Sequence, residues 1–374
     1  MHLYLHVPFC ARRCSYCDFA IAVRRETPSA EFADRILSEW RGWREHPRWA
    51  ASREIATLYF GGGTPSRLDP DALARIIGSI GADFPIATGA EITLEANPED
   101  VTPVAARAWR LAGVNRISLG VQSFDPAVLA WMHRTHTAPQ VPEAVATLRD
   151  AGFTDLSLDL IYALPSSLQR DWASDLGQAL ALTPSHLSLY GLTVEAHTPL
   201  GRWVDRGLAS PAPDERYADE FLLAHSTLAA AGYRHYEVSN YGQPGQQAEH
   251  NSAYWRRAPY LGLGPSAHSA TGDLRWWNIR DWAEWSRVIE AGGSAVAGEE
   301  LLESTSQRLE DLYLGLRTET GVPLELIPSA TLAAWQTAGW ALAEAGRVRL
   351  TAEGWLRLDA LVSQAGGPVD PDPC

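Results

Sequence analysis

In the first half of the chain, short apolar or β-branched runs alternate with longer segments whose apolar positions recur at helical spacing. The first runs cover 3–7, 55–60 and 91–96, and the segment near 30–45 predicts a helix between the first two. Further runs follow at 116–121, 156–162 and 186–192. This order predicts six βα units, and the near-continuous apolar character of the runs predicts parallel strands covered by helices.

An unbroken series of βα units favours a barrel over an open doubly wound sheet, so we expect a partial (βα)6 barrel over residues 1–192. In such barrels the functional residues lie at the C-terminal ends of the strands. The segments that follow the strands are unusual, with cysteines after the first, GGGTPS (61–66) after the second and ANPED (96–100) after the third. We therefore expect the site on this rim.

The regular alternation ends after residue 192. Residues 193–300 are punctuated by proline and glycine and predict an irregular α+β extension that completes the core. Residues 301–362 predict a helical, winged-helix-like module whose first helix begins near Ser304 and is closed by Gly321. Residues 363–374 contain few apolar groups and predict a flexible tail.

Composition narrows the class of protein. A hydrophobic fraction of 46% is typical of a globular chain with a buried core. We find no apolar run long enough to span a membrane, and the opening MHLYLHVPF does not resemble a signal peptide, so we expect a cytoplasmic location. A formal charge of −14 argues against nucleic acid as the main partner.

Three of the four cysteines, Cys10, Cys14 and Cys17, form a Cys-x3-Cys-x2-Cys pattern after the first strand, and Cys374 ends the chain. In a reducing compartment such a group binds metal or performs redox chemistry more often than it forms disulfides. Zinc would need a fourth ligand, for which His6 is the local candidate, and a redox pair of Cys14 and Cys17 leaves Cys10 without a role. A [4Fe-4S] cluster uses all three thiolates and leaves one iron open, so the pattern favours the cluster over both alternatives.

The cysteine pattern, together with GGGTP after the second strand, resembles the radical S-adenosylmethionine (SAM) superfamily, in which the open iron chelates SAM. Across nearly the whole chain, LYLHVPFC, FGGGTPS, EANPE, GVQSF, LDLIYALP and HLSLYGLT resemble the branch that contains oxygen-independent coproporphyrinogen III dehydrogenase and its haem-chaperone relatives of HemW type. The resemblance implies a [4Fe-4S] cluster on the three cysteines and SAM as a second cofactor. The SAM contacts that it implies are Tyr4, Tyr16, Gly62, Gly63, Glu95, Gln122, Arg134 and Asp159.

The residue types suit this implied site. Glu95 and Asp159 can accept hydrogen bonds from ribose hydroxyls or an amino group, Arg134 can pair with a carboxylate, and Tyr16 can stack on adenine. Asp159 lies among leucines, where an unpaired carboxylate is costly, which favours a site role. For Arg134, a plain surface position is the alternative.

Two departures separate the chain from the dehydrogenase. Phe19 stands where the dehydrogenase has a further cysteine, and nine residues precede Cys10 where the dehydrogenase has a long segment that helps to form its substrate site. The stretch HNSAYW (250–255) resembles the H-N-x-x-Y-W motif of the haem-chaperone branch. The resemblance therefore implies a chaperone that carries haem as cargo to an unidentified acceptor, including a peripheral membrane acceptor. The alternatives are oxidative decarboxylation of coproporphyrinogen III and a zinc- or cluster-stabilised interaction protein.

The HNSAYW stretch supplies the haem-binding candidates. The imidazole of His250 can coordinate haem iron, and Tyr254 and Trp255 can lie against the macrocycle. In the alternative, these side chains anchor a loop to the barrel. Further candidates for iron are His133, His136 and His268, those for the haem propionates are Arg256, Arg257, Arg275 and Arg280, and most of Trp276, Trp277, Trp282 and Trp285 are expected in the core.

Overall fold

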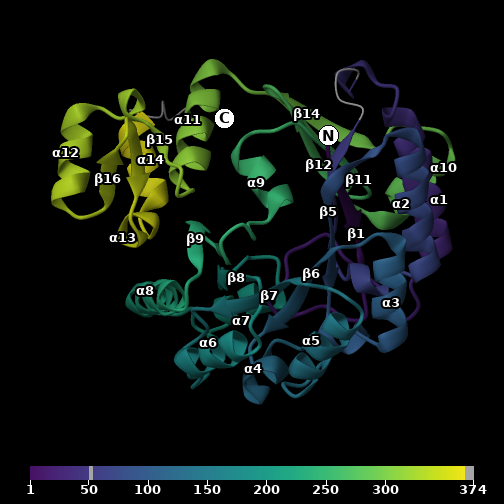
Figure 1. Cartoon of the computed structure of the whole chain (residues 1–374), viewed down its shortest axis with the longest axis horizontal. Coiled ribbons are helices and arrows are strands. Elements are labelled where there is room, and N and C mark those ends of the chain that lie inside the picture. The colour runs from purple at the N-terminus through teal and green to yellow at the C-terminus, as the bar shows by residue number, and fades with distance from the viewer. Residues whose placement is uncertain (50–53, 367–374) are drawn as a thin grey trace.

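The computed structural model describes residues 1–49 and 54–366 of the 374-residue chain. Its centre is a twelve-stranded sheet in the order β14-β13-β12-β11-β1-β4-β5-β6-β7-β8-β10-β9 (Figure 1). The six strands expected from the sequence are confirmed, and they pair in parallel in chain order. They are β1 (His2–Val7), β4 (Ile55–Gly62), β5 (Ile86–Ala96), β6 (Arg116–Gln122), β7 (Asp155–Tyr162) and β8 (His186–Gly191).

Helices between these strands cover the outer face of the sheet, which forms the partial barrel. Polar side chains begin several of them, as Asp69, Thr102, Asp125 and Asp171 each accept a hydrogen bond from a backbone N–H of the helix that follows. The helices are α1 (Ser29–Trp43), α2 (Pro70–Asp83), α3 (Pro103–Ala112), α4 (Pro126–Trp131), α5 (Gln140–Asp150) and α6 (Trp172–Ala181).

The parallel strands are less uniformly apolar than expected. In β1, Leu3 and Leu5 are fully buried in the core, whereas Tyr4 stacks on Tyr59 of β4, with ring centroids 6.0 Å apart. Successive side chains of a strand point to opposite faces, so alternate positions build an apolar outer layer and a polar lumen. The polar lumen is what makes the interior a candidate site.

Residues 193–300 extend the sheet at both ends, so this region is more regular than predicted. Beyond β8 lies β10 (Asn240–Gly242), antiparallel to β8, and then β9 (Arg234–Glu237), antiparallel to β10. Beyond β1 lies β11 (Tyr260–Leu263), parallel to it, followed by antiparallel strands. These are β12 (His268–Thr271), β13 (Leu274–Asn278) and β14 (Val296–Leu301), and the helices of the region are α7 (Pro199–Asp205), α8 (Asp214–Ala230), α9 (Glu249–Trp255) and α10 (Trp282–Glu290).

The C-terminal module has a small antiparallel sheet of its own, β15-β17-β16. Its helix α11 (Ser304–Leu316) begins where expected but ends before Gly321. Gly321 instead has a left-handed φ of 63° and packs so closely on the Val348 carbonyl that a Cβ would lie 2.0 Å from it. The other elements are β15 (Val322–Pro323), α12 (Ser329–Thr337), β16 (Ala341–Glu344), β17 (Arg347–Leu350), α13 (Ala352–Trp355) and α14 (Leu358–Gly366).

The end of the module also differs from expectation. Residues 363–366 of the predicted tail belong to α14, because Ala365 packs into the core with 3% exposure. Residues 367–374, with Cys374, lie outside the described residues. No helix in the described part of the chain has the length and hydropathy to cross a bilayer.

The C-terminal module contacts the large sheet near both of its ends. At one end, Thr318 forms an isolated β-bridge with Glu237 of β9. Near the other end, Arg275 of β13 forms an ion pair with Glu310 of α11. The helix α11 therefore lies across the opening between the two ends of the sheet (Figure 1).

Candidate cluster and ligand site

The three clustered cysteines lie in one loop at the carboxyl end of β1. Cys10 ends the short strand β2 (Phe9–Cys10), which pairs with β3 (Ala22–Val23) and so closes the loop that carries Cys14 and Cys17. All three are free thiols, Cys10 buried and the others half-buried. Burial raises the pKa of Cys10, and it raises that of Cys17 to about 11, so the thiolate forms need a nearby cation.

The glycine loop after β4 lies directly against the cysteine loop. A Cβ at Gly63 would lie 2.8 Å from the Pro8 carbonyl and 3.0 Å from Cys10 Sγ. Gly62 has φ of 115° and donates its N–H to Glu95 Oε2 at 3.0 Å, while a Cβ there would meet His6 at 2.6 Å. Side chains at these positions would separate the two loops, which explains why the sequence has glycine here.

Two half-buried carboxyl groups line the lumen next to these loops. Glu95 of β5 accepts hydrogen bonds from Tyr59 Oη at 2.8 Å and from Gly62. Asp159 of β7 accepts from Ser118 Oγ at 2.9 Å. Burial raises the pKa of Glu95 to about 7 and that of Asp159 to about 6. Both groups can therefore change charge near neutral pH.

Arg134 is held at the cluster loop. Its guanidinium donates to Asn97 Oδ1 at 2.6 Å and to the Gly120 carbonyl at 2.8 Å, and one nitrogen lies 3.9 Å from Cys14 Sγ. The alternative that Arg134 is an ordinary surface arginine is therefore wrong. An arginine beside a thiolate offsets negative charge, which suits the chemistry of a three-thiolate site.

The other SAM candidates and the two histidines considered for iron lie in different surroundings. Tyr16 packs against a small apolar cluster that includes Ile161 and Leu164. Gln122 ends β6 with φ of 68°. His136 is buried and its Nε2 lies 3.1 Å from the Val121 carbonyl, whereas His133 is exposed.

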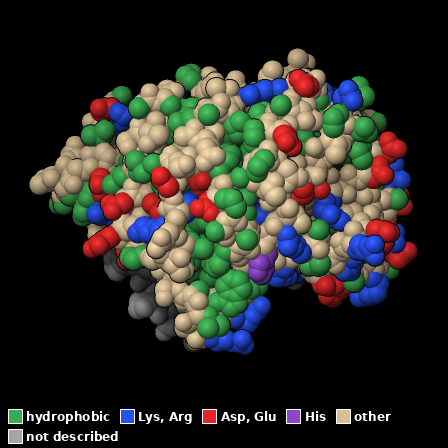
Figure 2. All heavy atoms as spheres, turned by 90° about the horizontal axis from the view of Figure 1, so that it is seen from below, with side chains coloured by type: hydrophobic (Ala, Val, Ile, Leu, Met, Phe, Trp, Pro, Cys, Tyr) green, Lys and Arg blue, Asp and Glu red, His purple; other side chains and the backbone are tan. Residues whose placement is uncertain are grey.

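Seen from the side of α4 and α7, hydrophobic side chains reach the surface near the middle of the molecule, with charged groups to both sides (Figure 2).

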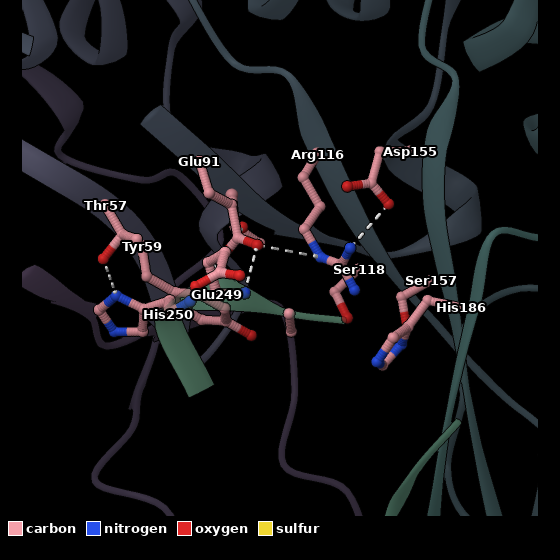
Figure 3. Close-up of polar contacts among 12 residues, drawn as sticks. Thr57, Tyr59, Glu91, Arg116, Ser118, Asp155, Ser157, His186, Glu249 and His250 are labelled. Atoms are coloured by element: carbon pink, nitrogen blue, oxygen red, sulfur yellow. Dashed lines mark hydrogen bonds and ion pairs between the residues drawn. The ribbon is translucent and has the colours of Figure 1, made fainter. Parts of the chain in front are cut away.

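The haem-motif histidine lies nearer the amino ends of the strands, and its ring stacks on that of the SAM candidate Tyr4 at a centroid distance of 6.4 Å. His250 of α9 is 1% exposed, and its Nδ1 lies 2.7 Å from Thr57 Oγ1 (Figure 3). Its Nε2 lies 2.7 Å from Tyr254 Oη. Its ring stacks on Tyr59 at a centroid distance of 4.9 Å. Burial lowers the pKa of His250 to about 3, so the imidazole is neutral. Both ring nitrogens are engaged in this arrangement.

A buried ion-pair network fixes the start of α9. Glu91 of β5 accepts the backbone N–H of Glu249 at 2.8 Å and of His250 at 3.1 Å (Figure 3). Arg116 of β6 lies 4.0 Å from Glu91 and 2.7 Å from Asp155. The carboxylate of Glu91 therefore caps the helix and faces a buried guanidinium at the same time.

The four arginines near α9 all have partners. Arg256 pairs with Glu249 at 3.3 Å, and Arg280 donates to the Asp18 carbonyl at 2.9 Å. Arg257 and Arg275 both pair with Glu310 of the C-terminal module. Most of the four tryptophans were expected in the core, and Trp276, Trp282 and Trp285 are buried whereas Trp277 is half-buried. His268 is exposed on β12.

Sequence reasoning missed several residues of the lumen. Thr57, Glu91 and Arg116 bind α9 or each other, and Asn97 holds Arg134. A signal for the strand residues was present in the period-two alternation of polar and apolar residues in runs such as EITLEA. Asn97 lies in the ANPED segment after β5 but shows no pattern of its own.

Comparison with known proteins places these features in a family context. The model of the radical SAM superfamily matches residues 4–175. The chain is 38% identical over 339 residues to the heme chaperone HemW of Synechocystis sp., a match that covers 87% of this chain and 80% of the relative. It is 38% identical over 269 residues to the heme chaperone HemW of Escherichia coli K12, covering 72% and 69%.

Two further comparisons agree with these. A mitochondrial radical S-adenosyl methionine domain-containing protein 1 of Mus musculus is 34% identical over 329 residues, covering 86% of this chain and 74% of that one. Among solved structures, the coproporphyrinogen III oxidase HemN of Escherichia coli superposes with a TM-score of 0.81 at 22% identity, covering 97% of this chain and 89% of that chain. The structural likeness extends the shared fold over the C-terminal module.

Proposed function

Because the chain belongs to the family of the heme chaperone HemW within the radical SAM superfamily, we propose that it binds haem and delivers it to an acceptor protein. The observation that carries the proposal is 38% identity to a heme chaperone over 87% of this chain. The family also implies a [4Fe-4S] cluster and SAM as cofactors.

We propose that Cys10, Cys14 and Cys17 hold the cluster. The donor set fits, because three free thiols lie in one loop and the Sγ of Cys10 lies against Gly63, where there is no room for a side chain. No three His, Cys, Asp or Glu side chains in the described ranges are placed to bind a single metal ion. A cluster does not require such a set, since each thiolate binds a different iron.

We propose that SAM occupies the lumen between the cysteine loop and the inner strand residues. When bound, the cluster and SAM together supply one-electron chemistry. The chain's own residues bind and orient: Glu95 and Asp159 offer carboxylate acceptors, and Arg134 places a positive charge at Cys14. The other residues proposed for this site are Tyr4, Tyr16, Gly62, Gly63 and Gln122.

We propose His250 as the haem ligand, with Tyr254 and Trp255 beside it. Since Nδ1 and Nε2 both have hydrogen-bond partners, iron can bind only after one of them is displaced. Rotation of the Tyr254 side chain alone would free Nε2, because the two residues lie on the same helix, whereas freeing Nδ1 would require α9 to move away from Thr57 of β4. We therefore expect haem binding to displace the Tyr254 hydroxyl from His250 while α9 stays in place.

The test is anaerobic reconstitution with iron and sulfide, followed by haem titration at the Soret band. The same sample is then incubated with coproporphyrinogen III, SAM and a reductant. We expect saturable haem binding and no decarboxylated product. Formation of protoporphyrinogen would instead support the decarboxylase alternative, and the absence of haem binding would contradict the chaperone proposal.

The cluster assignment has its own test. Cys14→Ala removes one thiolate, so the reconstituted variant should retain clearly less iron and sulfide than the wild type. Cys374→Ala, a thiol outside the described residues, is the matched control and should retain the full amount. Equal iron and sulfide content in the two variants would contradict the three-cysteine site.

A further inference from the structure

The helix α9 is seated on one row of residues that crosses six strands of the sheet. Residues paired across neighbouring strands point to the same face. The row consists of Glu91, Thr57, His2, Tyr260, Ala270 and Arg275.

Contacts from α9 follow this row from one end. Its first backbone N–H groups bind Glu91, His250 contacts Thr57, and the Tyr254 ring lies 4.5 Å from the Tyr260 ring. Arg275 lies further along the same row, beyond the helix. The row therefore leads from the proposed haem ligand to an arginine.

A second arginine comes from the end of α9 itself. Arg257 follows the helix with a φ of 53°, a left-handed conformation in which glycine is the favoured residue. Its Nε lies 3.1 Å from Glu310 Oε2, and its Nη1 donates to Asp311 Oδ1 at 2.7 Å. A glycine would relieve the backbone but could not make these contacts, so the guanidinium is the feature of interest at this position.

Arg257 and Arg275 converge on the same carboxylate, Glu310. Among the four arginines near α9, the other two lie apart, with Arg256 on Glu249 and Arg280 near the cysteine loop. The two carboxylates that pair with these arginines, Glu310 and Asp311, both belong to α11 of the C-terminal module. Two guanidiniums of the sheet and helix body are thus bound by two carboxylates of a separate element.

The same element covers α9 at a second point. The guanidinium of Arg317, next to the end of α11, lies 4.2 Å from the centre of the Trp255 ring. The indole Nε1 of Trp255 is buried without a hydrogen-bond partner. Displacement of α11 would expose both this indole and the arginine pair.

We propose that Arg257 and Arg275 form a binding site for the two carboxylates of a haem-type tetrapyrrole, and that Glu310 and Asp311 occupy this site as internal competitors. The proposal rests on the proposed haem function. A guanidinium binds a ligand carboxylate and a side-chain carboxylate by the same paired hydrogen bonds. Haem carries two carboxylates on one edge, so it can replace the pair supplied by α11. Haem binding and release of α11 are then linked, and the C-terminal module acts as a lid.

The experiment compares haem with haem dimethyl ester, which lacks the free carboxylates, in equilibrium titrations of the full-length protein. The variant Glu310→Gln/Asp311→Asn removes the competing charges while keeping side-chain size. We expect its dissociation constant for haem to fall by about three- to tenfold, in the range of partly exposed ion pairs. The dissociation constant for the dimethyl ester should not change.

A control variant makes the same change in net charge at a different place in the C-terminal module. Glu344→Gln/Glu353→Gln also removes two carboxylates of the C-terminal module, each paired with a module arginine, and should leave haem binding unchanged. Arg257→Gln/Arg275→Gln should weaken binding of haem but not of the ester. Circular dichroism and thermal unfolding establish that each variant is folded.

The outcomes separate the proposed lid from the proposed haem function. Equal haem affinity of the wild type and the Glu310/Asp311 variant overturns the lid and leaves the haem function standing. Equal strengthening for haem and for the ester also overturns it, because the carboxylates would then not matter. If neither protein binds haem, the proposed function fails, and the tetrapyrrole site fails with it.

Discussion

At the scale of single residues, two lumen carboxyl groups predict a pH dependence of SAM binding. Burial raises the pKa of Glu95 to about 7 and of Asp159 to about 6, so both are partly protonated just below neutral pH. Only the ionised forms accept hydrogen bonds from ligand hydroxyls or an amino group at both oxygens. We expect SAM affinity to fall as the pH is lowered from 8 to 5.5, by up to about tenfold for each unit below the apparent pKa.

Isothermal titration of the reconstituted protein across this pH range measures the effect. In Glu95→Gln the affinity should be lower at pH 8, and its decline with acidity should shift toward the lower pKa of Asp159. An affinity that is constant from pH 8 to 5.5 would remove both carboxylates from the SAM site.

The tyrosine beside His250 predicts a gain of function. Tyr254→Phe keeps the aromatic ring against His250 but removes the hydroxyl that lies 2.7 Å from Nε2. One competing hydrogen bond is lost, so haem affinity should rise by about two- to tenfold, whereas His250→Ala should weaken it or shift the Soret band. Haem titration of both variants checks this. A weaker Tyr254→Phe complex would mean that the hydroxyl assists haem binding.

Residue types were predictable only where spacing or a motif marked them. Cys10 of the cysteine pattern lies against Gly63 of the glycine loop. Glu91 and Arg116 were missed as site residues because each lies in a strand that is recognised from its apolar residues, and its polar residues carry no motif. Their partners come from distant parts of the chain, and a one-dimensional pattern does not show which polar side chains will meet.

At the scale of elements, Glu91 predicts how firmly α9 is held. Glu91→Gln keeps one acceptor for the helix N-terminus but removes the charge that faces the buried Arg116. We expect a loss of about 1–3 kcal/mol in the free energy of unfolding and faster amide exchange in α9. Urea denaturation and hydrogen exchange measure the two effects.

The matched control for this prediction is Glu249→Gln. Glu249 is an exposed carboxylate whose ion pair with Arg256 contributes little, so a change below about 0.5 kcal/mol is expected. If the two variants lose equal stability, the carboxylate of Glu91 is not what fixes α9.

Elements were predictable in proportion to their length and local pattern. The six parallel strands follow from runs that repeat with intervening helices. The short strands β10, β11 and β12 were missed, because strands of three or four residues carry little periodicity and form through their partners. The pairing of β11 with β1 joins residues from opposite parts of the chain, such as Tyr260 and His2.

At the scale of the whole molecule, one buried ion pair predicts how the C-terminal module is attached. Glu237 of β9 is fully buried and lies 2.9 Å from the guanidinium of Arg317. Arg317→Met leaves this carboxylate without its cation, so we expect a loss of about 3–5 kcal/mol in the free energy of unfolding. Urea denaturation followed by circular dichroism and tryptophan fluorescence measures the loss.

The double variant Arg317→Met/Glu237→Gln removes the stranded charge. It should recover part of the stability lost in Arg317→Met, because breaking a buried pair costs more than replacing both partners. A double variant less stable than Arg317→Met would show that Glu237 has another essential partner.

The domain boundaries expected at 192 and 300 stay predictions, since the extension and barrel share one sheet.

The position of α11 across the open side of the sheet has a mechanical consequence. A barrel of strands closed by backbone hydrogen bonds has a fixed circumference, because widening it means breaking a strand pair. Here the circle is completed by side-chain ion pairs and one isolated bridge. Its circumference can therefore change while every strand ladder stays intact. The width of the lumen is then adjustable although the sheet itself is rigid.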